Sequence, residues 1–409
     1  MSASWSVGQV VRRLLEPEGL ADPYSIYRVI RAAAEAGAPT GRFLFRYDDV
    51  RAALQDPALS SDRVAAILRP LPEGARAEAE LLEQTLRDIV VFTDQPDHRR
   101  VRRLLTQAFT PRTVEAARPL LEQVTERLLD AVDRSADSDG GAVDLHRDLT
   151  YPLPAMVVAA LLGIPEQSRS AFQAWALDIV LVVGSGTLTP ELAARANESM
   201  ARMRELMAEL VARRRREPGP DLLSAMIAAS DDGDRLSVDE LYANALFLMT
   251  AGHETATNML SNALLTLLRH PDQLKLLRAE PELLDGAIEE SIRFEGPVQI
   301  AARIADRDRE LRGLELRAGQ PLIAMIGAAN RDPDTFPDPD RFDITRRDGP
   351  HLGFAQGAHY CLGAALARAE MRVVLPAVLD RYPALRLAEE PSWQPTLDFR
   401  GPERLLVHR

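Results

Sequence analysis

Cysteine is almost absent from this sequence, because Cys361 is the only one among 409 residues. A single thiol cannot form an intramolecular disulfide, and it cannot build a cysteine-rich zinc site or an iron–sulfur cluster held by several thiolates. We therefore expect a chain that works in the reducing cytoplasm.

Positive charge and long apolar runs are also scarce. The 49 Lys and Arg residues face 61 Asp and Glu residues, and the resulting formal charge of −12 argues against a nucleic acid partner. No stretch reaches the about 18 uncharged apolar residues of a membrane span, and the first residues lack the apolar core of a signal peptide. The sequence thus predicts a soluble protein without a membrane or nucleic acid partner.

Internal repeats, low-complexity tracts and Gly/Ser linkers are missing as well, so residues 1–409 are expected to form a single domain. Apolar residues three and four apart predict helices over most of the chain, whereas short strand-like segments are few. The fold class is therefore expected to be mainly α with a small β part. Helices are expected at 101–109, 113–132, 151–162, 191–215 and 285–294, and strands at 42–47, 301–305, 320–326 and 405–407.

One predicted helix is much longer than the others. Ser237 and Glu240 have the spacing of a capping box, and the apolar pattern continues from there to Leu268. Gly252 lies inside this helix. Because glycine costs about 1 kcal/mol relative to alanine in a helix interior, its presence indicates close approach by another group or a local distortion.

The sequence around Cys361 carries the strongest chemical signal. Gly357 and Gly363 lie on either side of the cysteine, and a helix is expected to follow from residue 364. Glycine lets the backbone turn tightly and approach a flat object closely, while the positive end of the following helix favours a thiolate. We therefore predict a functional cysteine rather than an inert buried one.

This segment resembles the signature of the haem-thiolate monooxygenases of the cytochrome P-450 superfamily, Phe-x-x-Gly-x-x-x-Cys-x-Gly. Phe354, Gly357, Cys361 and Gly363 match it, and His359 fills the basic position two residues before the cysteine. The resemblance implies the P-450 fold, with one haem b (iron protoporphyrin IX) between the long helix and the cysteine loop. It also implies that Cys361 is the iron ligand, since thiolate donation favours cleavage of the O–O bond.

Two further motifs match the family at the expected places. Glu290 and Arg293 form its Glu-x-x-Arg pair, and Arg341 is implied to complete a buried structural network with them. The spacing of His98 and Arg102 places both on one helix face. The resemblance implies that the side chains holding the haem propionates are those of His98, Arg102, Arg303 and His359.

The long helix carries a fourth motif, Ala-Gly-x-Glu-Thr, formed by Ala251, Gly252, Glu254 and Thr255. It resembles the oxygen-activation groove of the family. A threonine can hydrogen-bond a carbonyl one turn back and open the helix, and Glu254 and Thr255 are implied to pass protons to dioxygen.

The substrate pocket implied by the resemblance is mostly aliphatic, which favours a hydrophobic small molecule. Asp178 interrupts the apolar pattern, and it is expected either to point to solvent or, if it points inward, to favour a substrate with a basic nitrogen. The implied pocket residues are Val90, Val91, Asp178, Leu248, Val298, Ile300 and Leu397.

The implied reaction is the insertion of one oxygen atom from O₂ into a hydrophobic organic substrate, by hydroxylation or epoxidation, in bacterial secondary metabolism. Electrons from NAD(P)H would arrive through a ferredoxin reductase and a ferredoxin, as in the soluble class I type, and the enzyme is expected to be a cytoplasmic monomer. Arg99, Arg100 and Arg103 predict a basic patch that attracts an acidic ferredoxin.

Two alternatives remain open. A peroxygenase takes its oxygen from peroxide and often lacks the acid–alcohol pair, so Glu254 and Thr255 argue against it. A non-catalytic haem-binding activator or gas sensor is the second alternative, and the intact Cys361 argues against the activator.

Overall fold

The computed structural model describes residues 7–36, 41–136, 142–184, 188–219, 221–231 and 236–409. The chain forms two compact units. The first unit comprises Met1–Leu59, Thr125–Leu153 and Thr255–Arg409, and the second comprises Ser60–Val124 and Pro154–Glu254.

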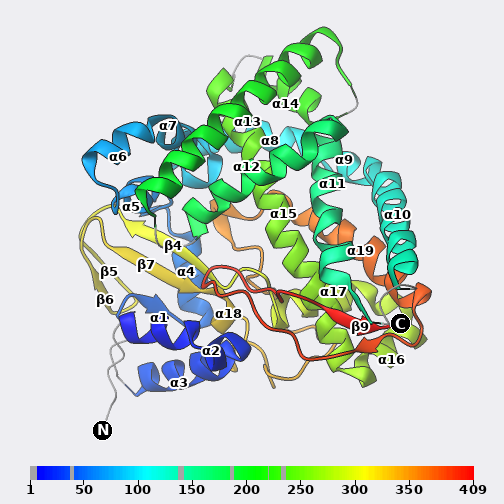
Figure 1. Cartoon of the computed structure of the whole chain (residues 1–409). Helices are drawn as coiled ribbons and strands as arrows, with labels where there is room; N and C mark the ends of the chain where they lie inside the picture. The colour runs from blue at the N-terminus through cyan, green and yellow to red at the C-terminus, as the bar shows by residue number, and fades with distance from the viewer. Residues whose placement is uncertain (1–6, 37–40, 137–141, 185–187, 220, 232–235) are drawn as a thin grey trace. The chain divides into compact units, whose positions relative to one another are not determined.

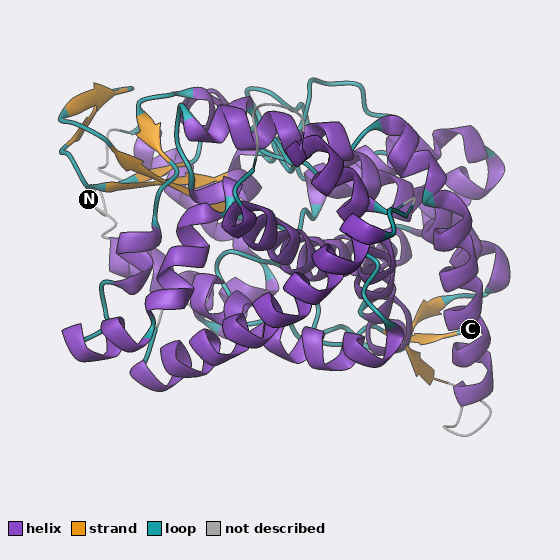
Figure 2. Ribbon diagram, turned by 90° about the horizontal axis from the view of Figure 1, so that it is seen from above, coloured by secondary structure: helices purple, strands orange, loops and turns teal. Residues whose placement is uncertain are grey.

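Helices dominate the described part of the chain and strands are confined to short segments (Figure 2). This confirms the predicted mainly α fold with a small β part. The helices of the first unit are α1 (Val7–Leu15), α2 (Pro17–Ala21), α3 (Pro23–Glu35), α4 (Tyr47–Gln55), α16 (Pro271–Ala279), α17 (Leu284–Phe294), α18 (Ile326–Ala329) and α19 (Ala364–Arg381). Those of the second unit are α5 (Val64–Leu68), α6 (Glu73–Glu78), α7 (Glu80–Asp88), α8 (Asp97–Ala108), α9 (Pro111–Ala116), α12 (Glu166–Gly184), α13 (Pro190–Arg216) and α14 (Leu222–Asp231).

Three described helices cross the boundary between the units in sequence: α10 (Arg118–Ala136), α11 (Pro152–Leu161) and α15 (Val238–Arg269), all labelled in Figure 1. The predicted capping box at the start of α15 is confirmed. The Ser237 amide donates to Glu240 Oε2 at 2.8 Å, and the Glu240 amide donates to Ser237 Oγ at 3.0 Å. These reciprocal hydrogen bonds give partners to two backbone amides that have none within the first turn of a helix.

The strands are β1 (Phe43–Leu44), β2 (Leu59–Ser60), β3 (Ala142–Asp144), β4 (Ile300–Ala305), β5 (Arg309–Leu311), β6 (Leu314–Leu316), β7 (Pro321–Met325), β8 (Arg386–Leu387) and β9 (Leu406–His408). In the described residues they pair in the orders β1-β7-β4-β2, β3-β9-β8 and β5-β6. β4 runs antiparallel to β7, whereas β1 runs parallel to it. Figure 1 shows α4 next to this sheet, and Val50 and Leu54 of α4 pack with Leu322 and Ala324 of β7 in a buried apolar cluster.

None of the described helices alone is long and apolar enough to cross a bilayer. One pair, His146–Leu161 with Glu166–Val183, has the necessary length and composition only when both members are taken together, and they meet at 115°.

Candidate functional site

The loop that carries Cys361 lies in the first unit and is closed by its own backbone. The Cys361 amide donates to the carbonyl of Phe354 at 2.9 Å, and the Tyr360 amide donates to the carbonyl of Gly357 at 3.1 Å. Gly357 has φ = 76°, and a Cβ there would lie 2.9 Å from the Leu54 carbonyl oxygen. Glycine is therefore required at this position for both its conformation and its close approach to α4.

The thiol of Cys361 is exposed and lies just before the N-terminus of α19, whose N-cap residue is Gly363. The helix dipole therefore favours the thiolate. The side of Gly363 that would carry a Cβ faces open space, with nothing within 4 Å. Among the described residues no group of three or more His, Cys, Asp or Glu side chains is placed to hold a metal ion. A single thiolate beside open space fits haem b, which brings its iron and equatorial nitrogen ligands with it.

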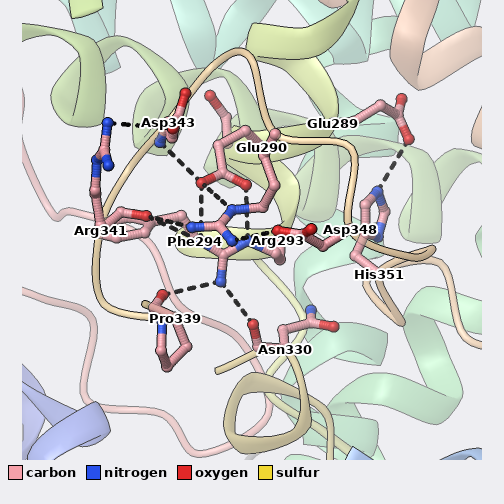
Figure 3. A network of polar contacts seen from close by, with 12 residues as sticks. Glu289, Glu290, Arg293, Phe294, Asn330, Pro339, Arg341, Asp343, Asp348 and His351 are labelled. Atoms are coloured by element: carbon pink, nitrogen blue, oxygen red, sulfur yellow. Dashed lines mark hydrogen bonds and ion pairs between the residues drawn. The ribbon is translucent and has the colours of Figure 1, made fainter. Parts of the chain in front are cut away.

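Glu290 and Arg293 of α17 form a buried ion pair (Figure 3). Arg293 donates from Nε and Nη2 to the two carboxylate oxygens at 2.7 and 2.8 Å, a two-point geometry typical of strong Arg–carboxylate pairs. Its Nη1 donates to the carbonyls of Asn330 and Pro339 at 2.8 and 2.9 Å. Burial lowers the pKa of Arg293, although Glu290 opposes the shift. The predicted pair is thus a structural joint between α17 and the chain that leads to the cysteine loop.

The prediction that the Arg341 side chain completes this network is wrong. That side chain is 64% exposed and pairs with Asp343 at 3.3 Å, away from Glu290 (Figure 3). Only its carbonyl takes part, accepting from Arg293 Nη2 at 3.3 Å. The third member is Arg346, which is 8% exposed and donates from Nε to Glu290 Oε1 at 3.2 Å.

Burial of neighbouring apolar residues sets the inner side of this segment. Phe342 and Ile344 are buried, while Arg341 and Thr345 are exposed. The chain then turns, because the Arg346 amide donates to the Asp343 carbonyl at 3.0 Å, and the Arg346 side chain reaches Glu290. No local spacing in the sequence identifies Arg346.

Two further predicted haem contacts lie in the first unit. Arg303 is 6% exposed on β4, opposite Leu322 of β7, and its Nη1 donates to the Ala302 carbonyl at 3.0 Å. His359 is half-buried in the short 3-10 helix Gly357–His359, two residues before the cysteine. Both side chains can donate hydrogen bonds, which suits a carboxylate ligand such as a haem propionate.

The predicted pocket residues of the first unit are partly buried. Val298 packs against the cluster around α4 and β7, whereas Ile300 and Leu397 pack against the cluster around α1 and α3. Leu397 also lines a small pocket that is partly open to solvent and includes Tyr27 and Arg400. The structure thus brings Ile300 and Leu397 together in this unit and places Val298 on a neighbouring cluster.

In the second unit, α8 carries His98 and Arg102 on one face, as the spacing predicts. His98 is 2% exposed and Arg102 is half-buried. Arg100 points elsewhere, because it forms an ion pair with Glu240, the capping residue of α15, with Nη1 3.0 Å from Oε2. The predicted basic patch therefore retains only two exposed arginines, Arg99 and Arg103.

The Ala-Gly-x-Glu-Thr segment interrupts the burial of α15. Residues 251–255 are all half-buried, as is Leu248, whereas residues 256–267 are fully buried. A Cβ on Gly252 would lie 3.2 Å from Val158 Cγ2 of α11, so close helix packing explains the glycine. Thr255 lies inside α15, which is assigned as α-helix from Val238 to Arg269.

Asp178 was assigned to the substrate pocket, and the structure corrects this prediction. Its side chain is 15% exposed and accepts from Arg195 Nε at 2.6 Å and from Ser199 Oγ at 2.7 Å. Asp178 therefore joins α12 to α13 instead of pointing to solvent or to a ligand. Val90 is buried and Val91 is half-buried in the 3-10 helix Val90–Phe92, where the Val90 amide donates to Asn244 Oδ1 at 2.9 Å.

Comparison with known proteins gives a consistent result. The family model described as cytochrome P-450 matches residues 69–396. The chain is 42% identical to cytochrome P-450 107B1 of Saccharopolyspora erythraea over 371 residues, which is 88% of this chain and 87% of that one. It is 40% identical to the cytochrome P-450 monooxygenase PikC of Streptomyces venezuelae over 398 residues, covering 95% and 91% of the two chains.

A third sequence relative, the 6-deoxyerythronolide B hydroxylase of Saccharopolyspora erythraea, is 39% identical over 374 residues, which is 88% of each chain.

A solved structure also has a similar fold. The crystal structure of P-450BioI in complex with hexadec-9Z-enoic acid ligated acyl carrier protein has a TM-score of 0.86 and 34% identity, covering 96% of this chain and all of that one.

Proposed function

Because the chain belongs to the cytochrome P-450 family of haem b monooxygenases, we propose that it inserts one oxygen atom from O₂ into a hydrophobic organic compound of bacterial secondary metabolism, by hydroxylation or epoxidation. The observation that carries this proposal is the similarity to the cytochrome P-450 monooxygenase PikC over 95% of this chain and to 6-deoxyerythronolide B hydroxylase over 88% of it. The half-buried, largely apolar stretch of α15 around Leu248 and Ala251 agrees with an apolar substrate.

The cofactor would be held by Cys361 as the iron ligand and by hydrogen-bond donors at the propionates. Arg303 and His359 are two of these donors, and His98 and Arg102 are the others by family resemblance. When bound, haem supplies the activation of O₂ and the transfer of one oxygen atom. The exposed thiol at the start of α19 and the buried guanidinium on β4 support this assignment.

Proton supply is assigned to Glu254 and Thr255 of α15. A carboxyl and a hydroxyl group in adjacent positions can take a proton from water and deliver it where charge develops. Their half-buried position gives them access both to water and to the interior. This pair favours the O₂-dependent reaction over the peroxide-driven one.

Electrons would come from NAD(P)H through a ferredoxin reductase and a ferredoxin. The exposed Arg99 and Arg103 of α8 support a docking site for an acidic protein. The natural substrate can be sought by measuring substrate-induced shifts of the haem Soret band. Since one structural neighbour was solved with an acyl chain on a carrier protein, the screen should include carrier-linked as well as free compounds.

The first test is the ferrous–CO spectrum of the purified protein. A thiolate ligand shifts the absorbance maximum to longer wavelength, and Cys361→Ser should abolish this shift together with turnover, because a hydroxyl group is a poor anionic ligand at neutral pH. A Cys361→Ser protein that retains the red-shifted band and its turnover would rule out the assignment. An unshifted wild-type spectrum would do the same.

A further inference from the structure

Glu289 lies next to Glu290 on α17 but serves a different set of contacts. Arg368 of α19 donates to it from Nε and Nη2 at 2.6 and 2.8 Å. His351, at the start of the chain segment that leads to Cys361, approaches its Oε2 with Nε2 at 3.1 Å (Figure 3). One carboxylate therefore links two helices and the segment that contains the cysteine.

Arg368 also contacts residues at both ends of the cysteine loop, Phe354 and Tyr360. Its Nη1 donates to the hydroxyl of Tyr360, the residue before Cys361, at 3.3 Å. Its guanidinium also lies 4.4 Å from the ring centroid of Phe354, whose carbonyl accepts the Cys361 amide. A planar guanidinium that is fixed along one edge by a carboxylate can stack on an aromatic ring and still donate from its other edge.

His351 holds the backbone just before the cysteine loop. A carboxylate can only accept, so Nε2 carries the proton toward Glu289, and Nδ1 accepts from the Gly353 amide at 3.0 Å. A Cβ on Gly353 would lie 2.5 Å from Ile292 Cγ2, so the backbone here is pressed against α17. The ring of His351 also lies 5.8 Å from that of Phe354.

Electrostatics agree with a charged Glu289. Burial alone would raise the pKa of this carboxyl, but hydrogen bonds from Arg368 and His351 outweigh it and lower the pKa to about 2. Glu289 is 43% exposed and Arg368 is 21% exposed. The contacts therefore lie partly in solvent, where a substitution is compatible with folding.

We propose that Glu289 is a positioning residue for the cysteine ligand: through Arg368 and His351 it fixes Phe354 and Tyr360, and thereby the direction of the Cys361 sulfur. The part of this proposal that concerns the iron rests on the proposed role of Cys361 as its ligand. The part that concerns the loop rests on the contacts given above.

The chain supplies a matched control on the same two helices. Asp285 of α17 accepts from Arg372 of α19 at 2.7 Å, and these residues lie four positions from Glu289 and Arg368, on the side away from the loop. Their side chains are 68% and 45% exposed. Loss of this pair weakens the α17–α19 connection without touching Phe354, Tyr360 or His351.

The experiment compares haem-loaded wild type, Glu289→Gln and Asp285→Asn. The first readout is the rate at which the ferrous–CO complex loses its red-shifted thiolate band in mild urea. We expect this rate to rise about tenfold in Glu289→Gln and to change less than about twofold in Asp285→Asn. Arg368→Lys should act like Glu289→Gln, since it keeps the charge but loses the planar stack and the two-point contact.

The second readout is hydrogen exchange of the amides of residues 352–361 in the ferric holoenzyme. Faster exchange in Glu289→Gln than in Asp285→Asn is expected, with similar melting temperatures for the two variants. Equal exchange in the two variants, or equal loss of the CO band, would overturn the proposal. A wild-type protein without the thiolate band would instead refute Cys361 as ligand, and the exchange rates would still decide whether Glu289 fixes the loop.

Discussion

Glu370 is a buried carboxyl group in α19. It is 1% exposed, and its Oε2 has no hydrogen-bond partner among the described residues. Burial raises the pKa of Glu370 from 4.5 to about 8. The carboxyl group is therefore neutral in the folded chain at pH 7, whereas it ionises in the unfolded chain.

This difference makes the stability of the protein pH-dependent. Between pH 4.5 and 8 the folded state keeps a proton that the unfolded state releases, so this group lowers the free energy of unfolding as the pH rises. Glu370→Gln keeps the shape and removes the titration. We expect the melting temperature of the variant to exceed that of the wild type by a few degrees more at pH 8 than at pH 5. A difference that is the same at both pH values would contradict this.

Arg346 and Arg341 make a second residue-scale prediction. Arg346→Ala removes one of the two cations that pair with buried Glu290, and because Glu290 keeps its pair with Arg293, we expect a loss of about 1.5–3 kcal/mol. Arg341→Ala removes an exposed side chain and should change the free energy of unfolding by about 0.5 kcal/mol or less. Thermal unfolding and the haem content of the two purified variants check this, and equal losses would contradict it.

These arginines also show what the sequence can and cannot reveal about a site. The spacing of Glu290 and Arg293 is local to one helix, so sequence reasoning found the pair. The choice between Arg341 and Arg346 depends on which way an irregular segment turns over α17, and that is decided by the burial of Phe342 and Ile344. Glu289 contacts Arg368 and His351, which lie 79 and 62 residues away in the sequence, and no local sequence pattern predicts these contacts.

At the scale of the element, α15 yields a prediction about coupling. Thr255→Ala should still bind haem and substrate, but product formed per NAD(P)H should fall about tenfold or more, with the missing electrons recovered as hydrogen peroxide. The expected cause is the loss of the hydroxyl group that we propose to deliver protons. Thr250→Ala is the matched control, because Thr250 is buried and donates within the helix to the Phe247 carbonyl at 3.0 Å. Unchanged coupling in Thr255→Ala, or equal loss in Thr250→Ala, would count against proton delivery.

The α12–α13 pair gives a different element-scale prediction. Asp178→Asn should weaken the ion pair with the largely exposed Arg195 and lower stability by about 1 kcal/mol or less. Because Asp178 joins two helices, the substitution should change the binding of amine ligands and of their neutral analogues equally. Titration of matched amine and alcohol ligands by Soret shift checks this. Weaker binding of the amines alone would show that Asp178 lines the substrate pocket.

Element boundaries were predictable where the signal is local. The capping box set the start of α15 within one residue. The expected helix 113–132 instead divides into α9 and α10, because Pro119 lacks the amide proton that would continue the first helix. The expected strand 42–47 shrinks to β1, since the Tyr47 amide donates to Asp332 Oδ2 at 2.7 Å at the start of α4. A contact across 285 residues decides that boundary, and the local sequence does not contain it.

At the scale of the whole molecule, the net charge determines whether a charged partner is attracted or repelled at long range. If the electron donor is an acidic ferredoxin, as we propose, the formal charge of −12 repels it at long range, and docking needs a local group of cations. Because Arg100 is engaged by Glu240, we propose Arg99 and Arg103 for that role; they are exposed one turn apart on α8. Their attraction acts within a Debye length of about 8 Å at physiological salt.

Reversal of both charges, Arg99→Glu with Arg103→Glu, should slow the first electron transfer from ferredoxin about tenfold at low salt and flatten its dependence on ionic strength. Substrate binding and peroxide-driven turnover should stay unchanged. The control is Arg213→Glu with Arg215→Glu, two exposed residues at the end of α13, because it alters the net charge by the same amount. If both double variants slow reduction equally, net charge governs the encounter. If neither does, the ferredoxin docks elsewhere; only a defect confined to the α8 variant assigns the docking surface to Arg99 and Arg103.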